Sequence, residues 1–204
     1  MIFLNKGYYY DVYDLGNIKV RKIEKGFLKK ITDAFIFEDR RILNWLGACY
    51  RIFTGKKHIL EVYAYMRDNV RLDMLGNPVF LKGIDYEQDK IELLETYLNR
   101  IPDEEAKKVI DRYIENIFES WRQGFSDRVY NFTINNGIDK NGDVILLDFN
   151  EITLSKDEVL KRIESKRWLR ASSYIRLNPL HKEYYHQKME SSMTKVNLEL
   201  FWKN

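Results

Sequence analysis

Residues 127–151 read DRVYNFTINNGIDKNGDVILLDFNE, and this stretch decides the fold expected for the second half of the chain. Two runs in which apolar and polar residues mix, FTINNGI and DVILLDF, flank a turn at residues 139–142. An Asn-Gly pair between such runs is the strongest short-range signal of a β-hairpin. Pairing the two strands brings Asp148, near the end of the second run, close to Asn131 or Asn135.

Those three side chains predict a metal site. Carboxylate and carboxamide oxygens at neighbouring strand ends suit a hard cation such as Mg²⁺, which takes a few protein oxygens and keeps other positions for water and phosphate. We therefore expect Mg²⁺ to be held by Asp148 together with Asn131 or Asn135.

The same order of residues resembles the protein-kinase-like superfamily. In that superfamily a catalytic Asp is followed by an Asn, a short hairpin and the Asp of an Asp-Phe-Gly motif. Two registrations are open. In the first, Asn135 stands 13 residues before Asp148, as the family's metal-binding Asn does, and Tyr130 occupies the place of the catalytic Asp. In the second, Asp127 is the catalytic Asp, Asn131 is the metal ligand, and the hairpin is longer by about two residues per strand.

Further positions carry the resemblance, and some depart from it. Residues 124–128, GFSDR, resemble the Gly-x-x-Asp-Arg loop of phosphoinositide-kinase-like enzymes. Asn150 stands where the Asp-Phe-Gly motif has its Gly, the His of the catalytic loop is missing, and the first predicted hairpin has no Gly-rich loop. The chain is most similar to the small bacterial YrbL-like proteins in its length, its Asp-Phe-Asn-Glu motif and the basic segment KRWLR at residues 166–170.

The resemblance also implies a nucleotide-binding Lys and a helical Glu that orients it. Lys22, in the sequence Val-Arg-Lys-Ile, is similar to that Lys, and Lys19 and Arg21 are alternatives. Glu38 is similar to the helical Glu, and Asp39 is the alternative. The implied ligands are ATP and Mg²⁺.

Composition bounds the class of protein. The chain has 204 residues, of which 45% are hydrophobic and 32% are charged, so we expect a globular domain with a sizeable core. The longest apolar runs are too short for a membrane-spanning helix. A net charge of +3 does not call for a nucleic-acid partner. A single cysteine, Cys49, excludes a disulfide framework within the chain, and we expect a cytoplasmic location.

The order of the predicted elements gives an α+β, two-lobed kinase-like fold. Residues 1–87 form an N-terminal antiparallel β-sheet lobe with one helix, and residues 88–204 form a C-terminal helical lobe with a β-hairpin. In the first lobe we expect a hairpin turning at Gly16-Asn17, a helix over 29–46 that stops at Gly47, and strands within 58–66, 69–75 and 77–84.

In the second lobe we expect helices over 88–98, from Pro102, and from a capping box at Ser155. Gly124 ends the second of these helices, and Asn178-Pro179 breaks the last. The helix that begins at Pro102 presents one broad apolar face, made by Val109, Ile110, Tyr113, Ile114, Ile117, Phe118 and Trp121.

Three functions remain open. The first is an ATP- and Mg²⁺-dependent phosphotransferase in which Asp127 accepts or orients the acceptor hydroxyl. The acceptor is unknown and is a small molecule or a protein. The second is a pseudokinase that binds nucleotide or a protein partner without catalysis. The third is an α+β adaptor unrelated to kinases.

Overall fold

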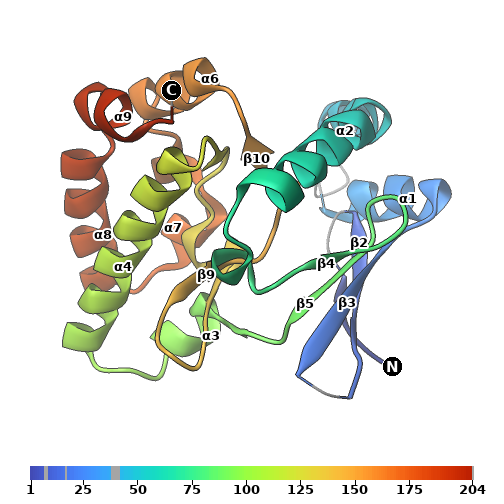
Figure 1. Ribbon diagram of the computed structural model, residues 1–204, viewed down its shortest axis with the longest axis horizontal. Helices are drawn as coiled ribbons and strands as arrows, with labels where there is room; N and C mark the ends of the chain where they lie inside the picture. The colour runs from blue at the N-terminus through green and yellow to red at the C-terminus, as the bar shows by residue number, and fades with distance from the viewer. Residues whose placement is uncertain (7–8, 17, 38–41, 204) are drawn as a thin grey trace. The chain divides into compact units, whose positions relative to one another are not determined.

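The computed structural model describes residues 1–6, 9–16, 18–37 and 42–203 and has a mixed α+β fold (Figure 1). It divides into two units, which we describe separately. Unit 1 consists of Met1–Asp68 and Asn77–Lys90, and unit 2 consists of Asn69–Gly76 and Ile91–Asn204. The boundary predicted after residue 87 lies close to this division, but the prediction had assigned the segment Asn69–Gly76 to the first lobe.

Unit 1 is built on a five-stranded antiparallel sheet with the strand order β1-β2-β3-β5-β4. Its elements are β1 (Ile2–Lys6), β2 (Tyr10–Asp14), β3 (Lys19–Glu24), α1 (Phe27–Phe37), α2 (Ile42–Asn69), β4 (Val79–Phe80) and β5 (Tyr86–Asp89). The predicted hairpin is present as β2 and β3, whose register pairs Val12 with Lys22. The predicted strand within 77–84 is present as β4.

The prediction of strands within 58–66 and 69–75 was wrong. The first of these segments lies in α2, and the second ends that helix and continues as the 3₁₀ helix η1 (Leu72–Leu75). Residues 58–66 are rich in strand formers, but Ile59, Val62, Tyr63 and Met66 are all buried. Their spacing is that of one helical face, and this periodicity outweighs the preference of single residues. Gly47, expected to stop the preceding helix, lies inside α2.

Unit 2 is mainly helical. Its elements after η1 are β6 (Glu92–Leu93), α3 (Leu94–Leu98), α4 (Asp103–Arg122), β7 (Ser126–Asp127), α5 (Phe132–Asn135), β8 (Asn136–Ile138), β9 (Val144–Leu146), β10 (Ile152–Thr153), α6 (Lys156–Glu164), η2 (Arg167–Arg170), α7 (Ser172–Arg176), α8 (Pro179–Ser192) and α9 (Lys195–Phe201). The prediction of a helix over 88–98 was wrong for the first half of the segment, which contributes to β5 and β6, whereas the second half forms α3. Tyr86 and Gln88 are buried and alternate with half-buried Glu87 and Asp89, which is the pattern of a strand.

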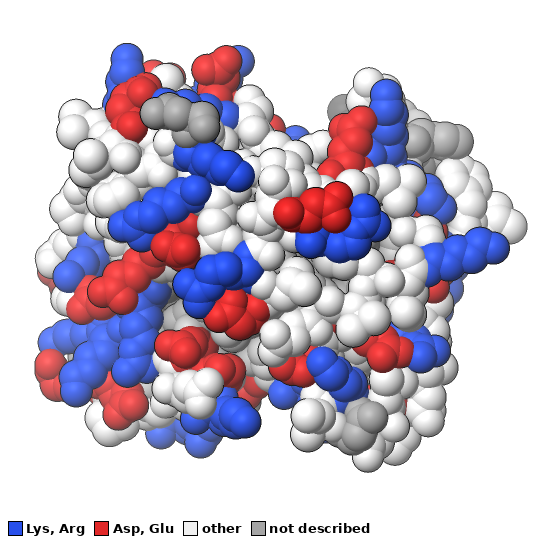
Figure 2. All heavy atoms as spheres, in the orientation of Figure 1, with Lys and Arg blue, Asp and Glu red and all other residues white. Residues whose placement is uncertain are grey.

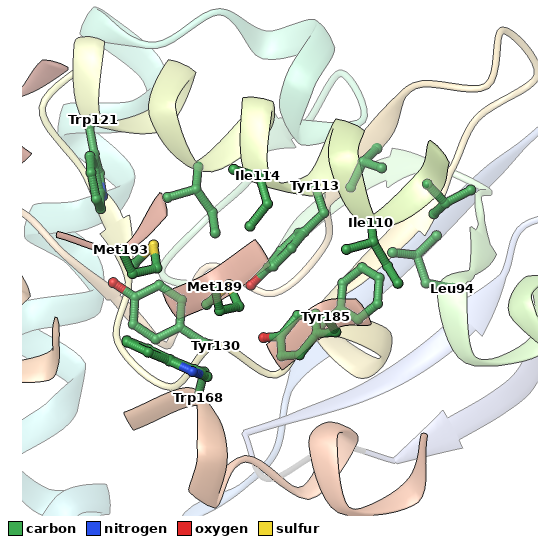
Figure 3. Packing of buried hydrophobic residues seen from close by; sticks show 14 of the residues in the cluster. Leu94, Ile110, Tyr113, Ile114, Trp121, Tyr130, Trp168, Tyr185, Met189 and Met193 are labelled. Atoms are coloured by element: carbon green, nitrogen blue, oxygen red, sulfur yellow. The ribbon is translucent and has the colours of Figure 1, made fainter. Parts of the chain in front are cut away.

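The core of unit 2 lies on α4, as predicted. The buried residues of its apolar face are Val109, Ile110, Tyr113, Ile114, Ile117 and Trp121, and Phe118 packs at the edge. Figure 3 shows side chains of α4 projecting toward Tyr185 and Met189 of α8. The ring centroids of Tyr113 and Tyr185 are 6.2 Å apart. β7 packs against α4, and Tyr130 of the loop that follows β7 is part of this core.

The predicted helix boundaries of unit 2 are confirmed where a cap or a glycine specifies them. Pro102 precedes the first residue of α4, and Gly124 adopts φ 79° just after its end. The Ser155 side chain accepts a hydrogen bond from the Glu158 backbone N–H at the start of α6, and Asn178 caps α8. Among the described residues, no helix combines the length and apolar character needed to cross a membrane.

Candidate functional site

The candidate site begins where α4 ends and the chain enters β7. Asp127, the last residue of β7, pairs with Ile152 of β10. Its Oδ1 atom accepts hydrogen bonds from the backbone N–H groups of Val129 (2.7 Å) and Tyr130 (3.0 Å). These bonds hold the carboxylate in one orientation and fold the loop that follows into a tight turn.

That loop contains a strained residue. Tyr130 has φ 54°, a left-handed conformation that a bulky side chain rarely adopts. Its side chain is fully buried, its ring packs edge-on against Trp168 at a centroid distance of 6.3 Å, and its hydroxyl lies 3.4 Å from the Ser126 hydroxyl. Packing therefore imposes the strained backbone, and strain of this kind is typical of functional loops.

The hairpin begins immediately after Asn135. Residues 132–135, expected to be strand, form one helical turn because the Asn135 N–H donates to the Asn131 carbonyl at 2.8 Å. The hairpin itself is confirmed, with three-residue strands β8 and β9 and the expected turn, where Gly142 has φ 85°. The strands are therefore shorter than the second registration required. The Asn135 carbonyl accepts the Leu147 N–H, so the residue after Leu147, Asp148, follows directly on the closed hairpin.

Asn135 joins two carboxylates. Its Nδ2 atom donates to Glu151 Oε2 at 2.8 Å and lies 3.4 Å from Asp127 Oδ2. Because Nδ2 faces these acids, the amide oxygen Oδ1 points elsewhere, and among the described residues it accepts no hydrogen bond. The side chain of Asn131 also forms a hydrogen bond with Glu151, and its Oδ1 atom accepts the Ser172 hydroxyl at 3.1 Å. Of the two predicted amide ligands, Asn135 is the more buried, and it is the one whose Oδ1 accepts no hydrogen bond among the described residues.

Asp148 lies at the opposite end of the hairpin from the turn. One of its oxygens, Oδ1, accepts the Asn150 backbone N–H at 3.0 Å, which fixes the carboxylate in a short turn. The side chain is partly exposed, whereas the next residue, Phe149, is fully buried and anchors the segment.

Two carboxylates of this site, Asp127 and Glu151, have raised pKa values. Burial raises the pKa of Asp127 to about 6, the backbone N–H groups of Val129 and Tyr130 oppose the rise, and the negative charge of Asp148 adds to it. Burial also raises the pKa of Glu151 to about 7, and the charges of Asp148 and Asp127 contribute. Ionising these carboxylates therefore costs free energy, and a cation bound nearby would reduce that cost.

Lys22 lies in unit 1, on the face of the sheet that packs against α2. Its Nζ atom is 5.1 Å from the ring centroid of Tyr86, which contacts Tyr63 of α2. The two alternatives occupy the other face of β3, where Arg21 binds Glu87 (Nε–Oε1 2.8 Å) and Lys19 binds Asp89 (2.6 Å). Glu38 and Asp39 lie outside the described residues.

The structure brings together Asp127 and Asn135, with Asp148 close enough to influence the first. Within the described part of the chain, no group of three His, Cys, Asp or Glu side chains is arranged to hold a metal ion. Sequence reasoning did not assign a role to Glu151. Its only signal was its place in the Asp-Phe-Asn-Glu motif, directly before β10.

No known protein-family model matches this chain, and a search of curated proteins finds no match to it.

Proposed function

We propose that this protein is an ATP- and Mg²⁺-dependent phosphotransferase of the kinase-like superfamily. The observation that carries the proposal is the contact between Asp127 and Asn135 at the entrance of a hairpin that is followed directly by Asp148. Kinases use the same order for the Asp that accepts the substrate proton, the Asn and the Asp that bind metal. The proposal combines parts of both registrations, with Asp127 from one and Asn135 from the other.

The oxygens of this site fit Mg²⁺. Asn135 offers its amide Oδ1, and Asp148 offers the carboxylate oxygen that is not bound to the Asn150 N–H. Mg²⁺ is usually held by one or two such protein oxygens, with water and phosphate in the remaining positions. When bound, the ion would neutralise the charge of nucleotide phosphates and relieve the repulsion among the carboxylates.

Asp127 is suited to receive a proton from an acceptor hydroxyl. A general base works best when its pKa is near the operating pH, and burial raises the pKa of Asp127 to about 6. At pH 7 and above the carboxylate is mostly ionised and can accept a hydrogen bond from the hydroxyl. Its two backbone hydrogen bonds occupy Oδ1, so Oδ2 is the atom that would face the acceptor.

Lys22 is the proposed ligand of the nucleotide α- and β-phosphates. The observation that favours it over Lys19 and Arg21 is its position on β3, because both alternatives lie on the opposite face of the sheet, where they bind Asp89 and Glu87. The Lys22 ammonium lies over the Tyr86 ring, 5.1 Å from its centroid, which holds the side chain on this face of the sheet.

The test is phosphoryl transfer from ATP by wild type and Asp127→Asn, across a panel of hydroxylated acceptors and with water. Loss of a positioned general base typically costs about 10² to 10⁴ in rate. We expect the variant to bind ATP as tightly as wild type and to lose turnover by this factor. If the wild type binds ATP but transfers phosphate to no acceptor, the protein is a pseudokinase. Equal turnover in both proteins would remove Asp127 from the mechanism.

A further inference from the structure

Many charged side chains in the described part of unit 2 form an ion pair with a side chain of opposite charge. Figure 2 shows Lys and Arg interspersed with Asp and Glu over one face of the molecule. Examples are Lys107 with Glu104 and Lys188 with Asp111. Arg167, the first residue of η2, differs. Among the described residues it forms no hydrogen bond and no ion pair, although it is only partly exposed.

The surroundings of Arg167 make an unpaired guanidinium unusual. Burial lowers the pKa of Arg167, and the neighbouring cations Arg162 and Arg170 act in the same direction. The carboxylates of Glu151 and Asp127 act in the opposite direction, but neither forms an ion pair with it. Arginines that lose solvent contact are normally paired, because an uncompensated charge in such a position is costly.

Two nearby arginines, Arg128 and Arg162, do not share this situation. Arg128 Nε and Arg162 both donate to the Glu158 carboxylate, each at 3.0 Å, so Glu158 serves two cations. Arg170 resembles Arg167, since it also lacks a hydrogen bond or an ion pair among the described residues, but it is exposed. Two arginines of one helical turn are therefore without an anionic partner.

η2 lies next to the candidate site and is held there by contacts with the loop after Asp127. Trp168 is almost fully buried and packs against Tyr130, the strained residue of the loop after Asp127. Just beyond η2, the Ser172 hydroxyl donates to Asn131 Oδ1 at 3.1 Å, in the same loop. Arg167 and Arg170 thus extend from a segment that is attached at two points to the loop that carries Asp127.

We propose that Arg167 and Arg170 bind a phosphate group of the substrate, and that the phosphate belongs to a small-molecule acceptor with a free hydroxyl. The identification as an acceptor rests on the proposed phosphotransferase function, whereas phosphate binding itself does not. The guanidinium group matches phosphate geometry with two parallel N–H donors and stays charged at all relevant pH values. A bound phosphate would neutralise the two unpaired cations and place the acceptor hydroxyl within reach of the Asp127 loop.

The first experiment is a titration with inorganic phosphate, without nucleotide or metal, followed by NMR. Hydrogen bonds to a charged group are strong enough that losing one weakens binding by about 10- to 100-fold. We expect Arg167→Gln to weaken phosphate binding by at least about 10-fold, and Arg170→Gln, at an exposed position, to weaken it less. Lys161→Gln, which removes the same charge from an exposed position on α6, should change the affinity by less than about twofold.

Circular dichroism checks that each variant is folded, and the exposed Arg170→Gln provides a second test if Arg167→Gln is not. If phosphate does not bind to wild type, or binds equally to wild type and to both arginine variants, the proposal is wrong. Because this titration contains no nucleotide, its result is independent of whether the protein is a kinase.

The second experiment identifies the owner of the phosphate group. We expect Arg167→Gln to leave the affinity for Mg-ATP unchanged, and to raise the KM for a phosphorylated acceptor without changing the KM for its unphosphorylated counterpart. If the variant instead loses affinity for Mg-ATP, the arginines hold a nucleotide phosphate, and the assignment to an acceptor is overturned.

Discussion

Asp127→Asn should make the metal-free protein more stable at alkaline pH. The substitution keeps the shape of the side chain, and its amide oxygen can still accept the N–H groups of Val129 and Tyr130. What it removes is a negative charge that is surrounded by protein and lies near two other carboxylates, Asp148 and Glu151. The same variant is the proposed loss-of-turnover variant, so its stability decides whether that result can be interpreted.

The magnitude follows from the pKa of Asp127. Its rise from 3.8 to about 6 corresponds to about 3 kcal/mol of destabilisation when the group is ionised. The pKa of Asp127 is higher in the folded than in the unfolded protein, so the folded protein holds the proton more tightly. The contribution of Asp127 to stability is therefore most favourable below pH 3.8 and is lost as the pH rises from 3.8 to about 6.

The substitution also has a cost. The new Nδ2 group would face the Nδ2 of Asn135, now 3.4 Å from Asp127 Oδ2, and the bonds to the two backbone N–H groups would lose their charge assistance. Together these losses cost about 1 kcal/mol, which offsets part of the stabilisation gained by removing the charge. The net gain at pH 8 is therefore about 2 kcal/mol, and it falls to about zero near pH 4.5.

Urea unfolding in EDTA at pH 4.5 and pH 8 measures this difference. Asp143→Asn, at an exposed carboxylate in the hairpin turn, is the control and should change the free energy of unfolding by less than about 0.5 kcal/mol at either pH. If Asp127→Asn were less stable than wild type at pH 8, the carboxylate would be a structural brace. The reasoning from buried charge would then be refuted.

Two further substitutions, one in each unit, give separate tests. Gly137→Ala should destabilise the protein by about 1–3 kcal/mol in urea unfolding, because the added Cβ would lie 2.6 Å from the Glu92 carbonyl oxygen. The control Gly26→Ala, whose added Cβ meets no atom within 4 Å, should be close to neutral, and equal effects of the two substitutions would disprove this account of the hairpin. Lys22→Met should lower the affinity for Mg-ATP measured by calorimetry while costing at most about 1 kcal/mol of stability; the same loss in Lys19→Met would show that the wrong cation was assigned.

Helix faces and caps were predictable from the sequence where local chemistry and packing agree. The apolar face of α4 repeats at helical spacing and is buried, and Ser155 caps α6 because its hydroxyl is placed to accept a nearby N–H. The segment 58–66 was misread because its residues favour strands individually, while the burial that decides the outcome follows a helical period.

The sequence predicted which residues belong to the candidate site, but it did not decide between the two registrations, with Asn131 or Asn135 as the metal ligand. The turn at residues 139–142 and Asp148 follow from local patterns. Which Asn lies beside Asp127 depends on one turn of helix over 132–135, which backbone hydrogen bonds to Asn131 create. Nothing in the sequence distinguishes this turn from the start of a strand. Arg167 was visible only as part of a basic segment, since the lack of a partner is a property of tertiary structure.

The most direct test of the proposed function is a calorimetric titration of ATP, with Mg²⁺ and with EDTA, into wild type, Asp148→Asn and Asp143→Asn. Asn at position 148 can keep the hydrogen bond to the Asn150 N–H, so this variant removes the metal-binding charge and leaves the turn in place. We predict that wild type and Asp143→Asn bind ATP more tightly with Mg²⁺ than with EDTA, and that Asp148→Asn loses this difference while remaining folded. Wild type that binds no ATP, or Asp148→Asn that keeps the full effect of Mg²⁺, would contradict the proposed function.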